Sequence, residues 1–316
     1  MRAISLKQSE LTYQASITEP IPNVGEVLVD ISLAGICETD LQLCKGYMSF
    51  SGILGHEFVG VARSGKYAGQ RVVGEINCIC SRCEWCLKGA GNHCPSRSVI
   101  GILGRDGAFA DVLAIPEMNL HPVPDTVSDE QAVFVEPLAA ALQVGRQVDL
   151  EKCSVAVLGD GRLGMLSAQA TRLTADAVLV VGKHVEKLTR FERLGIPTVL
   201  LGALPQGASF DVVIDCTGSS SGLSLATQLV KPSGTIVMKT TVAGNHDVSL
   251  ASIVINEINL VGSRCGPFDQ ALSVLDSDSV DLTGLISHRF SLAEIDDAMR
   301  AAVSPEAFKV ILDMGM

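Results

Sequence analysis

The chain has 316 residues, of which 47% are hydrophobic and 19% charged, and its formal net charge at pH 7 is -11. This length exceeds that of a typical single domain, so two domains are expected. The acidic balance argues against nucleic acid or an anionic membrane as a partner. Neither an apolar run of about 18 residues nor a signal peptide is visible in the sequence, so a cytoplasmic location is expected.

Residues 1 to about 125 predict a mostly β domain. They are rich in Gly, Pro and short β-branched runs, such as residues 27–29, 58–61 and 71–73, and they show few windows of helical period. This segment contains a lone Cys37 and a Gly55-His56-Glu57 triplet. One thiolate, one imidazole and one carboxylate from separated segments are ligands that leave a zinc ion one open position. The pattern therefore predicts a metal site with a chemical role.

Four further cysteines, Cys80, Cys83, Cys86 and Cys94, form a C-x2-C-x2-C-x7-C run. Four closely spaced thiolates close a tetrahedral zinc shell and leave no room for substrate, so this site is predicted to be structural. The alternative is an iron–sulfur cluster, which the long last gap disfavours.

From residue 128 the pattern changes to alternating helices and strands. An Ala- and Leu-rich helix is predicted over 129–148, and an apolar strand of the doubly buried kind over 153–158. Further strands are predicted over 177–181, 198–201, 211–214, 235–238 and 258–261, and further helices over 163–173, 185–194 and 222–230. The alternation predicts an α/β fold with a doubly wound parallel sheet. Helices are also predicted over 268–275 and 292–303, and a last strand over 309–312 could return to the amino-terminal domain.

A glycine-rich loop, Gly159-Asp160-Gly161-Arg162-Leu163-Gly164, follows the first of these strands and opens a helix. This is the G-x-G-x-x-G pattern of dinucleotide binding. Gly159 permits the tight turn, Gly161 lets a pyrophosphate approach the backbone, and Gly164 lets helix and strand pack closely. The backbone N–H groups of Arg162 and Leu163 are the expected donors to the anion.

The next strand ends at Gly182, where an NAD-preferring fold carries an Asp or Glu that binds the adenosine ribose. Lys183, His184 and Lys187 follow, and these basic side chains could surround a 2′-phosphate. We therefore predict that NADP(H) is favoured over NAD(H). The alternative is that the three side chains are a solvated basic face.

Taken together, the motifs resemble the zinc-dependent medium-chain dehydrogenase/reductase superfamily, to which alcohol dehydrogenases belong. In chain order they are Gly35-Ile36-Cys37-Glu38-Thr39-Asp40, Gly55-His56-Glu57, the four-cysteine run, Val135-Glu136-Pro137-Leu138-Ala139 and Asp215-Cys216-Thr217-Gly218. The resemblance implies a GroES-like, mostly β catalytic domain over 1–137 and 266–316 that holds both zinc sites. It implies a Rossmann dinucleotide-binding domain over 138–265.

The resemblance also implies a ligand set for the catalytic zinc, namely Cys37, His56 and Glu136. A carboxylate at the third position is typical of the polyol, glucose and threonine dehydrogenase branch, whereas other alcohol dehydrogenases have a cysteine there. Glu57 would then be a direct ligand or would exchange with water on the zinc, and the alternative is that it is a plain buried ion-pair partner. Asp40 is expected to orient His56.

Thr39 occupies the family position of the hydroxyl that takes the proton from the alcohol. In many relatives a histidine three residues further on completes the path to solvent, but this chain has Gln42 there. Because an amide cannot titrate, water, Glu38, Glu57 or the cofactor ribose must carry out the last step.

Other matched positions are expected to contact the substrate or the cofactor. Thr217 and Arg264 would approach the nicotinamide half, and Lys309 would contact the pyrophosphate. Four residues would line the substrate pocket, with burial in the core as the alternative: Tyr47, Met48, Ile76 and Phe109.

We therefore predict an enzyme, a zinc-dependent NAD(P)-dependent alcohol dehydrogenase/reductase with two zinc ions per subunit. Its substrate would be a small alcohol, aldehyde or ketone, and the chain would form a dimer or tetramer without nucleic acid or membrane partners. One alternative is a sugar or polyol dehydrogenase that uses NAD. An alternative of another class is a non-catalytic, zinc-stabilised NADPH-binding redox sensor.

Overall fold

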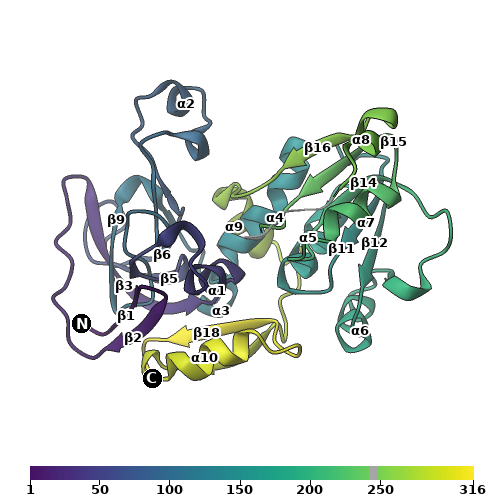
Figure 1. The fold of residues 1–316 in the computed structure, drawn as a ribbon. Coiled ribbons are helices and arrows are strands. Elements are labelled where there is room, and N and C mark those ends of the chain that lie inside the picture. Colours follow the sequence, from purple (N-terminus) through teal and green to yellow (C-terminus); the bar gives the residue numbers. More distant parts are fainter. Residues whose placement is uncertain (242–247) are drawn as a thin grey trace. The chain divides into compact units, whose positions relative to one another are not determined.

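The computed structural model describes residues 1–241 and 248–316. The chain divides into two compact units (Figure 1). The first, called the β unit, comprises Met1–Glu136, Leu275–Ser277 and Leu282–Met316. The second, called the α/β unit, comprises Pro137–Val274 and Asp278–Asp281.

A seven-stranded sheet forms the centre of the β unit. Its strands are β3 (Glu26–Gly35), β5 (Glu57–Ala62), β6 (Arg71–Gly74), β9 (Val112–Pro116), β10 (Leu120–Pro122), β17 (Ile286–Phe290) and β18 (Lys309–Asp313). The strand order is β10-β6-β5-β3-β18-β17, and β9 also pairs with β3. All neighbours are antiparallel except β17 and β18. The last strand of the chain, β18, thus returns to the amino-terminal sheet, as predicted.

Smaller sheets and short helices complete the β unit. The strands are β1 (Ala3–Lys7), β2 (Glu10–Gln14), β4 (Gly52–Ile53), β7 (Asn77–Cys78) and β8 (Ser98–Val99). The helices are α1 (Glu38–Cys44), α2 (Glu84–Leu87), α3 (Asp129–Ala132), α10 (Ile295–Ala302) and the 3-10 turns η1 (Tyr47–Ser49), η2 (Gly91–His93), η3 (Glu117–Asn119) and η5 (Leu292–Glu294). One apolar core includes Leu6, Val29, Phe58 and Ala298, whereas the lobe with α2 projects away from the sheets (Figure 1).

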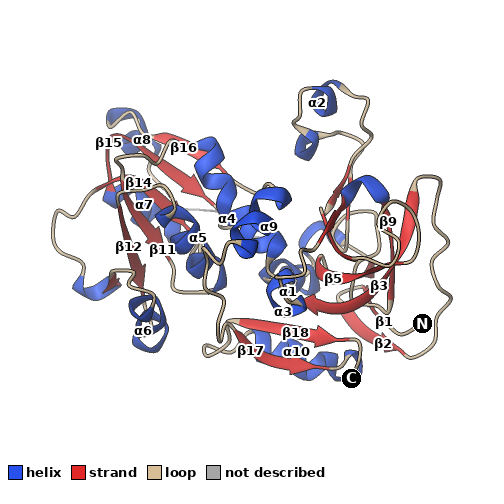
Figure 2. Cartoon of the chain, turned by 180° about the vertical axis from the view of Figure 1, so that it is seen from behind, coloured by secondary structure: helices blue, strands red, loops and turns tan. Residues whose placement is uncertain are grey.

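The α/β unit is built on a six-stranded sheet that is parallel throughout. Its strands are β11 (Ser154–Leu158), β12 (Ala177–Gly182), β13 (Thr198–Leu200), β14 (Phe210–Asp215), β15 (Val230–Met238) and β16 (Asn259–Gly262). The helices that belong to it or extend into it are α4 (Val135–Gln147), α5 (Arg162–Arg172), α6 (Val185–Arg193), η4 (Leu201–Ala203), α7 (Gly222–Leu229), α8 (Leu250–Ile255) and α9 (Phe268–Asp276) (Figure 2). The order β13-β12-β11-β14-β15-β16 places β12 and β14 on either side of β11. The loops that follow these three strands therefore share one edge of the sheet, where such folds bind ligands.

The predicted α/β fold class and doubly wound sheet are confirmed, with local differences. The helix predicted over 129–148 is two helices, α3 and α4, separated at Val133 and Phe134, whose side chains are buried. The sequence did not predict β17, which is half-exposed and carries polar residues at its centre, nor the short helix α8.

The position of the second domain boundary also differs from the predicted residue 266. In the structure the α/β unit continues past residue 266 to Val274. Gly266 packs directly on α4, where an added Cβ would overlap the carbonyl oxygen of Ala139. This close packing keeps the segment after β16 within the α/β unit.

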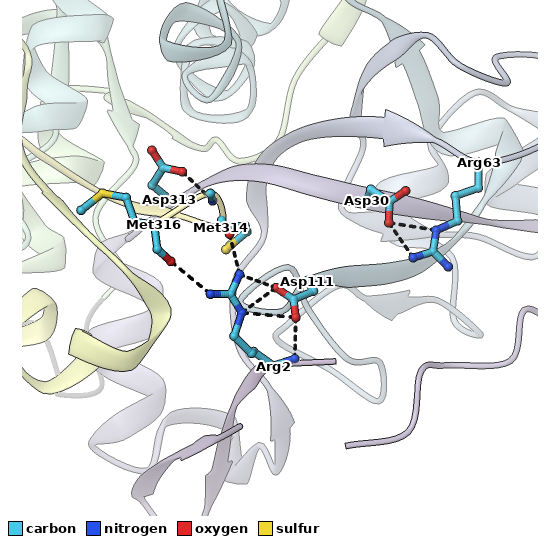
Figure 3. Close-up of polar contacts among 8 residues, drawn as sticks. Arg2, Asp30, Arg63, Asp111, Asp313, Met314 and Met316 are labelled. Atoms are coloured by element: carbon cyan, nitrogen blue, oxygen red, sulfur yellow. Dashed lines mark hydrogen bonds and ion pairs between the residues drawn. The ribbon is translucent and has the colours of Figure 1, made fainter. Parts of the chain in front are cut away.

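Arg2 ties the two ends of the chain together within the β unit (Figure 3). Its guanidinium donates to the Asp111 carboxylate at 2.9 Å and 3.1 Å, and to the backbone carbonyls of Met314 and Met316.

None of the helices in the described residues has the length and apolar character needed to cross a membrane.

Candidate metal and cofactor sites

The side chains of Cys37, His56 and Glu57 converge, and their ligand atoms all lie within 4.8 Å of one another. Strands β3 and β5 explain this convergence, because they are antiparallel neighbours with Gly35 directly opposite Glu57. Cys37 follows β3 by two residues and is the N-cap of α1. The fold thus brings together the three side chains that the sequence predicted to form an open metal site.

Asp40 connects two members of this group. It has no exposed surface, and one of its carboxylate oxygens accepts a hydrogen bond from the Cys37 N–H at 2.8 Å. The other lies 3.4 Å from Nδ1 of the buried His56 ring. Burial alone would lower the pKa of His56, but the charges of Asp40 and Cys37 outweigh it and raise the pKa well above its usual value. Asp40 is therefore placed to hold the imidazole in one orientation.

The thiol of Cys37 is shifted toward its ionised form. Burial alone would raise its pKa, but the charge and hydrogen bond of His56 outweigh burial and lower it. The thiolate is the form in which cysteine binds a metal. Sγ of Cys37 lies 3.7 Å from Oγ1 of Thr39, so the predicted proton-accepting hydroxyl lies directly beside the site.

Glu57 forms an ion pair with Lys309, and both side chains are almost fully buried. Gly35 makes the room for this pair, since a Cβ there would lie 2.6 Å from Oε2 of Glu57 and 2.7 Å from Cε of Lys309. Burial lowers the pKa of Lys309 to about 8, although the charges of Cys37 and Asp40 act to raise it. The structure places this ammonium on Glu57, whereas its contact with a pyrophosphate stays a prediction.

Glu136, the predicted third zinc ligand, lies in the first turn of α4. The negative charge of Glu136 acts on Cys37 and favours a higher pKa of its thiol. Among the described residues, the group of converging ligand atoms consists of Cys37, His56 and Glu57 and does not include Glu136. Glu57 is thus the carboxylate already at the site, and a bond from Glu136 to the metal stays a prediction.

The cysteines of the α2 lobe form a second group, also with all sulfurs within 4.8 Å: Cys80, Cys83, Cys86 and Cys94. Sγ of Cys86 lies 3.4 Å from that of Cys83 and 4.0 Å from that of Cys80. A tetrahedral zinc with bonds of about 2.3 Å holds its sulfurs about 3.8 Å apart, so the spacing fits. Backbone N–H groups of Arg82 and Cys83 lower the pKa of Cys80 to about 6.

The two large apolar side chains of α2 add no buried core to the lobe. Trp85 is 48% exposed and Leu87 is 76% exposed, so neither side chain builds a core. A metal that crosslinks the thiolates would supply the missing stability. The donor sets of both groups therefore fit zinc, one with four sulfurs and the other with sulfur, nitrogen and oxygen.

In the α/β unit, the three glycines of the dinucleotide loop have the surroundings expected of them. Gly159 has a φ of +114° and would place a Cβ 2.7 Å from the carbonyl oxygen of Cys216. A Cβ at Gly164 would overlap the carbonyl oxygen of Gly159, whereas Gly161 faces open space. The loop is therefore closed where strand and helix pack and open where a pyrophosphate would approach the start of α5, at Arg162 and Leu163.

The end of β12 contains an acid that the sequence analysis missed. No Asp or Glu follows this strand directly, but the carboxylate of Asp160 accepts hydrogen bonds from the backbone N–H groups of Lys183 and His184. Lys183 and His184 themselves are exposed, and Lys187, which is partly buried, lies in the first turn of α6. An acid therefore lies beside Gly182 in space, although none follows it in the sequence.

The other predicted cofactor contacts lie at the same edge of the sheet. Thr217 follows β14, and its hydroxyl donates to Oδ1 of Asp215 at 2.7 Å. Arg264 is exposed and follows β16 by two residues.

The predicted substrate-pocket residues have different surroundings in the β unit. Met48 is 46% exposed with a φ of +56°, and Tyr47 is half-buried. Ile76 is 7% exposed, and Phe109 is fully buried beneath Gly55, where it belongs to the core. Of the four, the structure leaves Tyr47 and Met48 accessible, and the role of the set stays a prediction.

Comparisons with known proteins place these sites in context. Residues 23–125 match the alcohol dehydrogenase GroES-like domain, and residues 163–277 match the zinc-binding dehydrogenase domain. A sorbitol dehydrogenase from Halalkalibacterium halodurans is 28% identical, with 93% of each chain covered. Among solved structures, an alcohol dehydrogenase from Escherichia coli with NADH has a TM-score of 0.91 at 26% identity and 99% coverage of each chain. A zinc-binding dehydrogenase from Sinorhizobium meliloti bound to NADP has a TM-score of 0.88 at 29% identity, covering 99% of this chain and 98% of that one.

Proposed function

The chain belongs to the zinc-dependent medium-chain dehydrogenase/reductase superfamily, and we propose that it transfers a hydride between a small alcohol or carbonyl compound and a nicotinamide dinucleotide. The observation that carries the proposal is the convergence of Cys37, His56 and Glu57 in a chain that also has an open dinucleotide loop. A redox sensor without turnover would need the loop but not this ligand set.

Each residue at the site of Cys37, His56 and Glu57 would have a separate role. Zinc bound by Cys37 and His56, with Glu57 or Glu136 as the carboxylate ligand, would supply Lewis-acid chemistry at the substrate oxygen. Asp40 holds the imidazole through Nδ1 and the start of α1 through the Cys37 N–H, so it fixes two ligands at once.

Thr39 is the proposed proton acceptor, because its hydroxyl lies beside Cys37. The path to solvent then passes Gln42, whose amide donates to Oε1 of Glu38 at 2.9 Å on an exposed face of α1. Since Gln42 cannot titrate, we propose that Glu38 or water passes the proton to solvent. The four-cysteine lobe would hold the second zinc of the subunit and take no part in the chemistry.

The finer points of substrate and assembly also belong to this proposal. The sorbitol dehydrogenase relative and the carboxylates at 57 and 136 support a polyol or sugar alcohol as the alternative to a simple alcohol or ketone. A homo-oligomer is supported by exposed apolar side chains at the edge strand β16 and the helix before it: Leu250, Val254, Ile255 and Leu260. Against the predicted preference for NADP(H), the carboxylate of Asp160 lies beside Gly182 although no acid follows it in the sequence.

The test is a turnover assay of the zinc-loaded protein with NAD⁺ and NADP⁺ against secondary alcohols and polyols, and with the reduced cofactors against the matching ketones. We expect at least one substrate class to be converted, and we expect Cys37→Ser to abolish the reaction. Tight binding of zinc and reduced cofactor without turnover of any compound would instead support the redox sensor.

A further inference from the structure

The loops that follow β11 and β12 are joined by one side chain. The two strands are parallel neighbours with Leu158 opposite Val181, and the N–H of Gly159 donates to the carbonyl of Val181 at 2.9 Å. Asp160, the next residue of the glycine loop, therefore starts directly beside the end of β12. Its side chain crosses to the neighbouring loop and lies at the amino end of α6.

The contacts of Asp160 are those of an ionised, fixed carboxylate. Oδ2 accepts from the N–H groups of Lys183 at 2.7 Å and His184 at 2.8 Å, and Nδ1 of the His184 ring lies 3.1 Å from both oxygens. Burial alone would raise the pKa of Asp160, but these hydrogen bonds outweigh it and lower the pKa. Because a carboxylate only accepts, Nδ1 of His184 must carry a hydrogen.

The side chain of Asp160 occupies the space that a side chain at position 182 would need. A Cβ on Gly182 would lie 2.6 Å from Oδ2 of Asp160 and 2.8 Å from its Cβ. It would also lie 2.6 Å from Cδ2 of Leu188, the far end of a flexible side chain that can turn aside. Residue 160 thus fills the volume in which a side chain at 182 would begin. The acid at this edge of the sheet is present, but the glycine loop supplies it.

We propose that Asp160 selects the cofactor at its adenosine ribose and that it favours NAD(H) over NADP(H), an inference that rests on the proposed function. The side chain is 10% exposed, and among hydrogen bonds of the described residues Oδ1 receives only the His184 ring. A second lone pair of Oδ1 is therefore left for a ribose hydroxyl.

A 2′-phosphate at the same place would meet a fixed negative charge. It would also find the backbone N–H groups of Lys183 and His184 already bonded to Asp160, although these are the donors that an anion at the start of α6 would use. Specificity of this kind comes from a repulsive element as much as from an attractive one. The exposed side chain of Lys183 is then solvated and does not bind a 2′-phosphate, which reverses the preference predicted from the sequence.

The first experiment measures the dissociation constants of NADH and NADPH by fluorescence titration of the zinc-loaded protein. We expect the wild type to bind NADPH about ten-fold more weakly than NADH, and Asp160→Asn to lower this ratio about ten-fold. The matched control is Asp176→Asn, an exposed acid just before the opposite end of β12, which should leave the ratio unchanged. Equal affinities in the wild type, or a ratio that Asp160→Asn leaves unchanged, would overturn the inference.

A swap of the two positions tests the shared volume independently. Gly182→Asp should lower the melting temperature and weaken NADH binding, because its side chain overlaps Asp160. The double variant D160G/G182D should regain stability and keep the wild-type preference for NADH. A double variant no better than Gly182→Asp would contradict the inference, and this arm remains decisive if Asp160→Asn does not fold. A wild type that binds neither cofactor would contradict the proposed function as well, whereas two cofactors bound equally contradict the inference alone.

Discussion

Glu57 on β5 and Lys309 on β18 form an ion pair that is almost closed to solvent, although 252 positions separate them in the chain. The carboxylate of this pair is also one of the three converging groups of the candidate metal site. The pair therefore connects the last strand of the chain to the site. Removal of either partner would leave a buried charge without compensation, which is strongly destabilising.

Gly35→Ala tests the space that this pair requires. The new Cβ would lie 2.6 Å from Oε2 of Glu57, so the ion pair must shift, and we expect the free energy of unfolding to fall by about 1–3 kcal/mol. The measurement is urea unfolding of the metal-loaded protein. Gly145→Ala inside α4 is the control, since its Cβ would meet nothing closer than 3.8 Å and a helical alanine is favourable. Equal stabilities of the two variants would show that the pair tolerates displacement.

Thr39→Ala and Gln42→Ala separate the two ends of the proposed proton path. Thr39 lies beside Cys37, whereas the amide of Gln42 donates to Oε1 of Glu38 on an exposed face of α1. We expect Thr39→Ala to lower kcat by about 100-fold or more and Gln42→Ala to have a small effect. Steady-state kinetics decide, with Thr39→Ser as the variant that keeps the hydroxyl. Comparable losses at both positions would count against this path.

Loss of one metal at a time should separate chemistry from stability. Cys83→Ser should remove one zinc per subunit and lower the melting temperature, because the α2 lobe has little core of its own. Cys37→Ser should remove the other zinc and abolish turnover. Metal analysis with thermal unfolding is the measurement, and Cys44→Ser, outside both groups, should keep two zinc ions. An iron–sulfur absorption band in the wild type would contradict the assignment of the lobe.

The thiol of Cys216 offers a test of the pH behaviour of the α/β unit. Burial raises its pKa to about 11, and Sγ lies 3.4 Å from Oγ of Ser167. Because only the thiolate reacts, alkylation by iodoacetamide should be very slow at pH 8 and should rise roughly ten-fold per pH unit below the pKa. Peptide mapping by mass spectrometry follows the modification. Cys153, whose pKa is raised less strongly, should react faster at pH 8, and the reverse order would be inconsistent with the raised pKa of Cys216.

Local patterns explain what could be predicted from the sequence. The four-cysteine run and the glycine loop each lie within about 15 residues, so the spacing alone carries the geometry. The neighbouring strands β11 and β12 of the α/β unit are nearly continuous apolar runs because both faces of a parallel sheet are covered. By contrast β17 carries Ser287, His288 and Arg289 at its centre, so no apolar period marked it as a strand.

Contacts between distant segments explain what could not be predicted. The ion pair of Lys309 with Glu57 is one such contact, because β18 enters the sheet beside β3 and buries the ammonium there, whereas the contact of Lys309 with a cofactor stays a prediction. The sequence at the end of β12 is Gly182 followed by basic residues, and it therefore predicted that no acid lies there. Nothing in the local pattern showed that Asp160, on the preceding loop, reaches into that place.

The central claim is hydride transfer at the site of Cys37 and His56, and the most direct measurement follows the hydrogen itself. Alcohols and polyols deuterated at the carbinol carbon are incubated with zinc-loaded protein and oxidised cofactor, and the reduced cofactor is analysed by mass spectrometry. We expect one deuterium per reduced nicotinamide with the wild type and none above background with Cys37→Ser. Tight cofactor binding with no deuterium transfer from any alcohol would contradict the account.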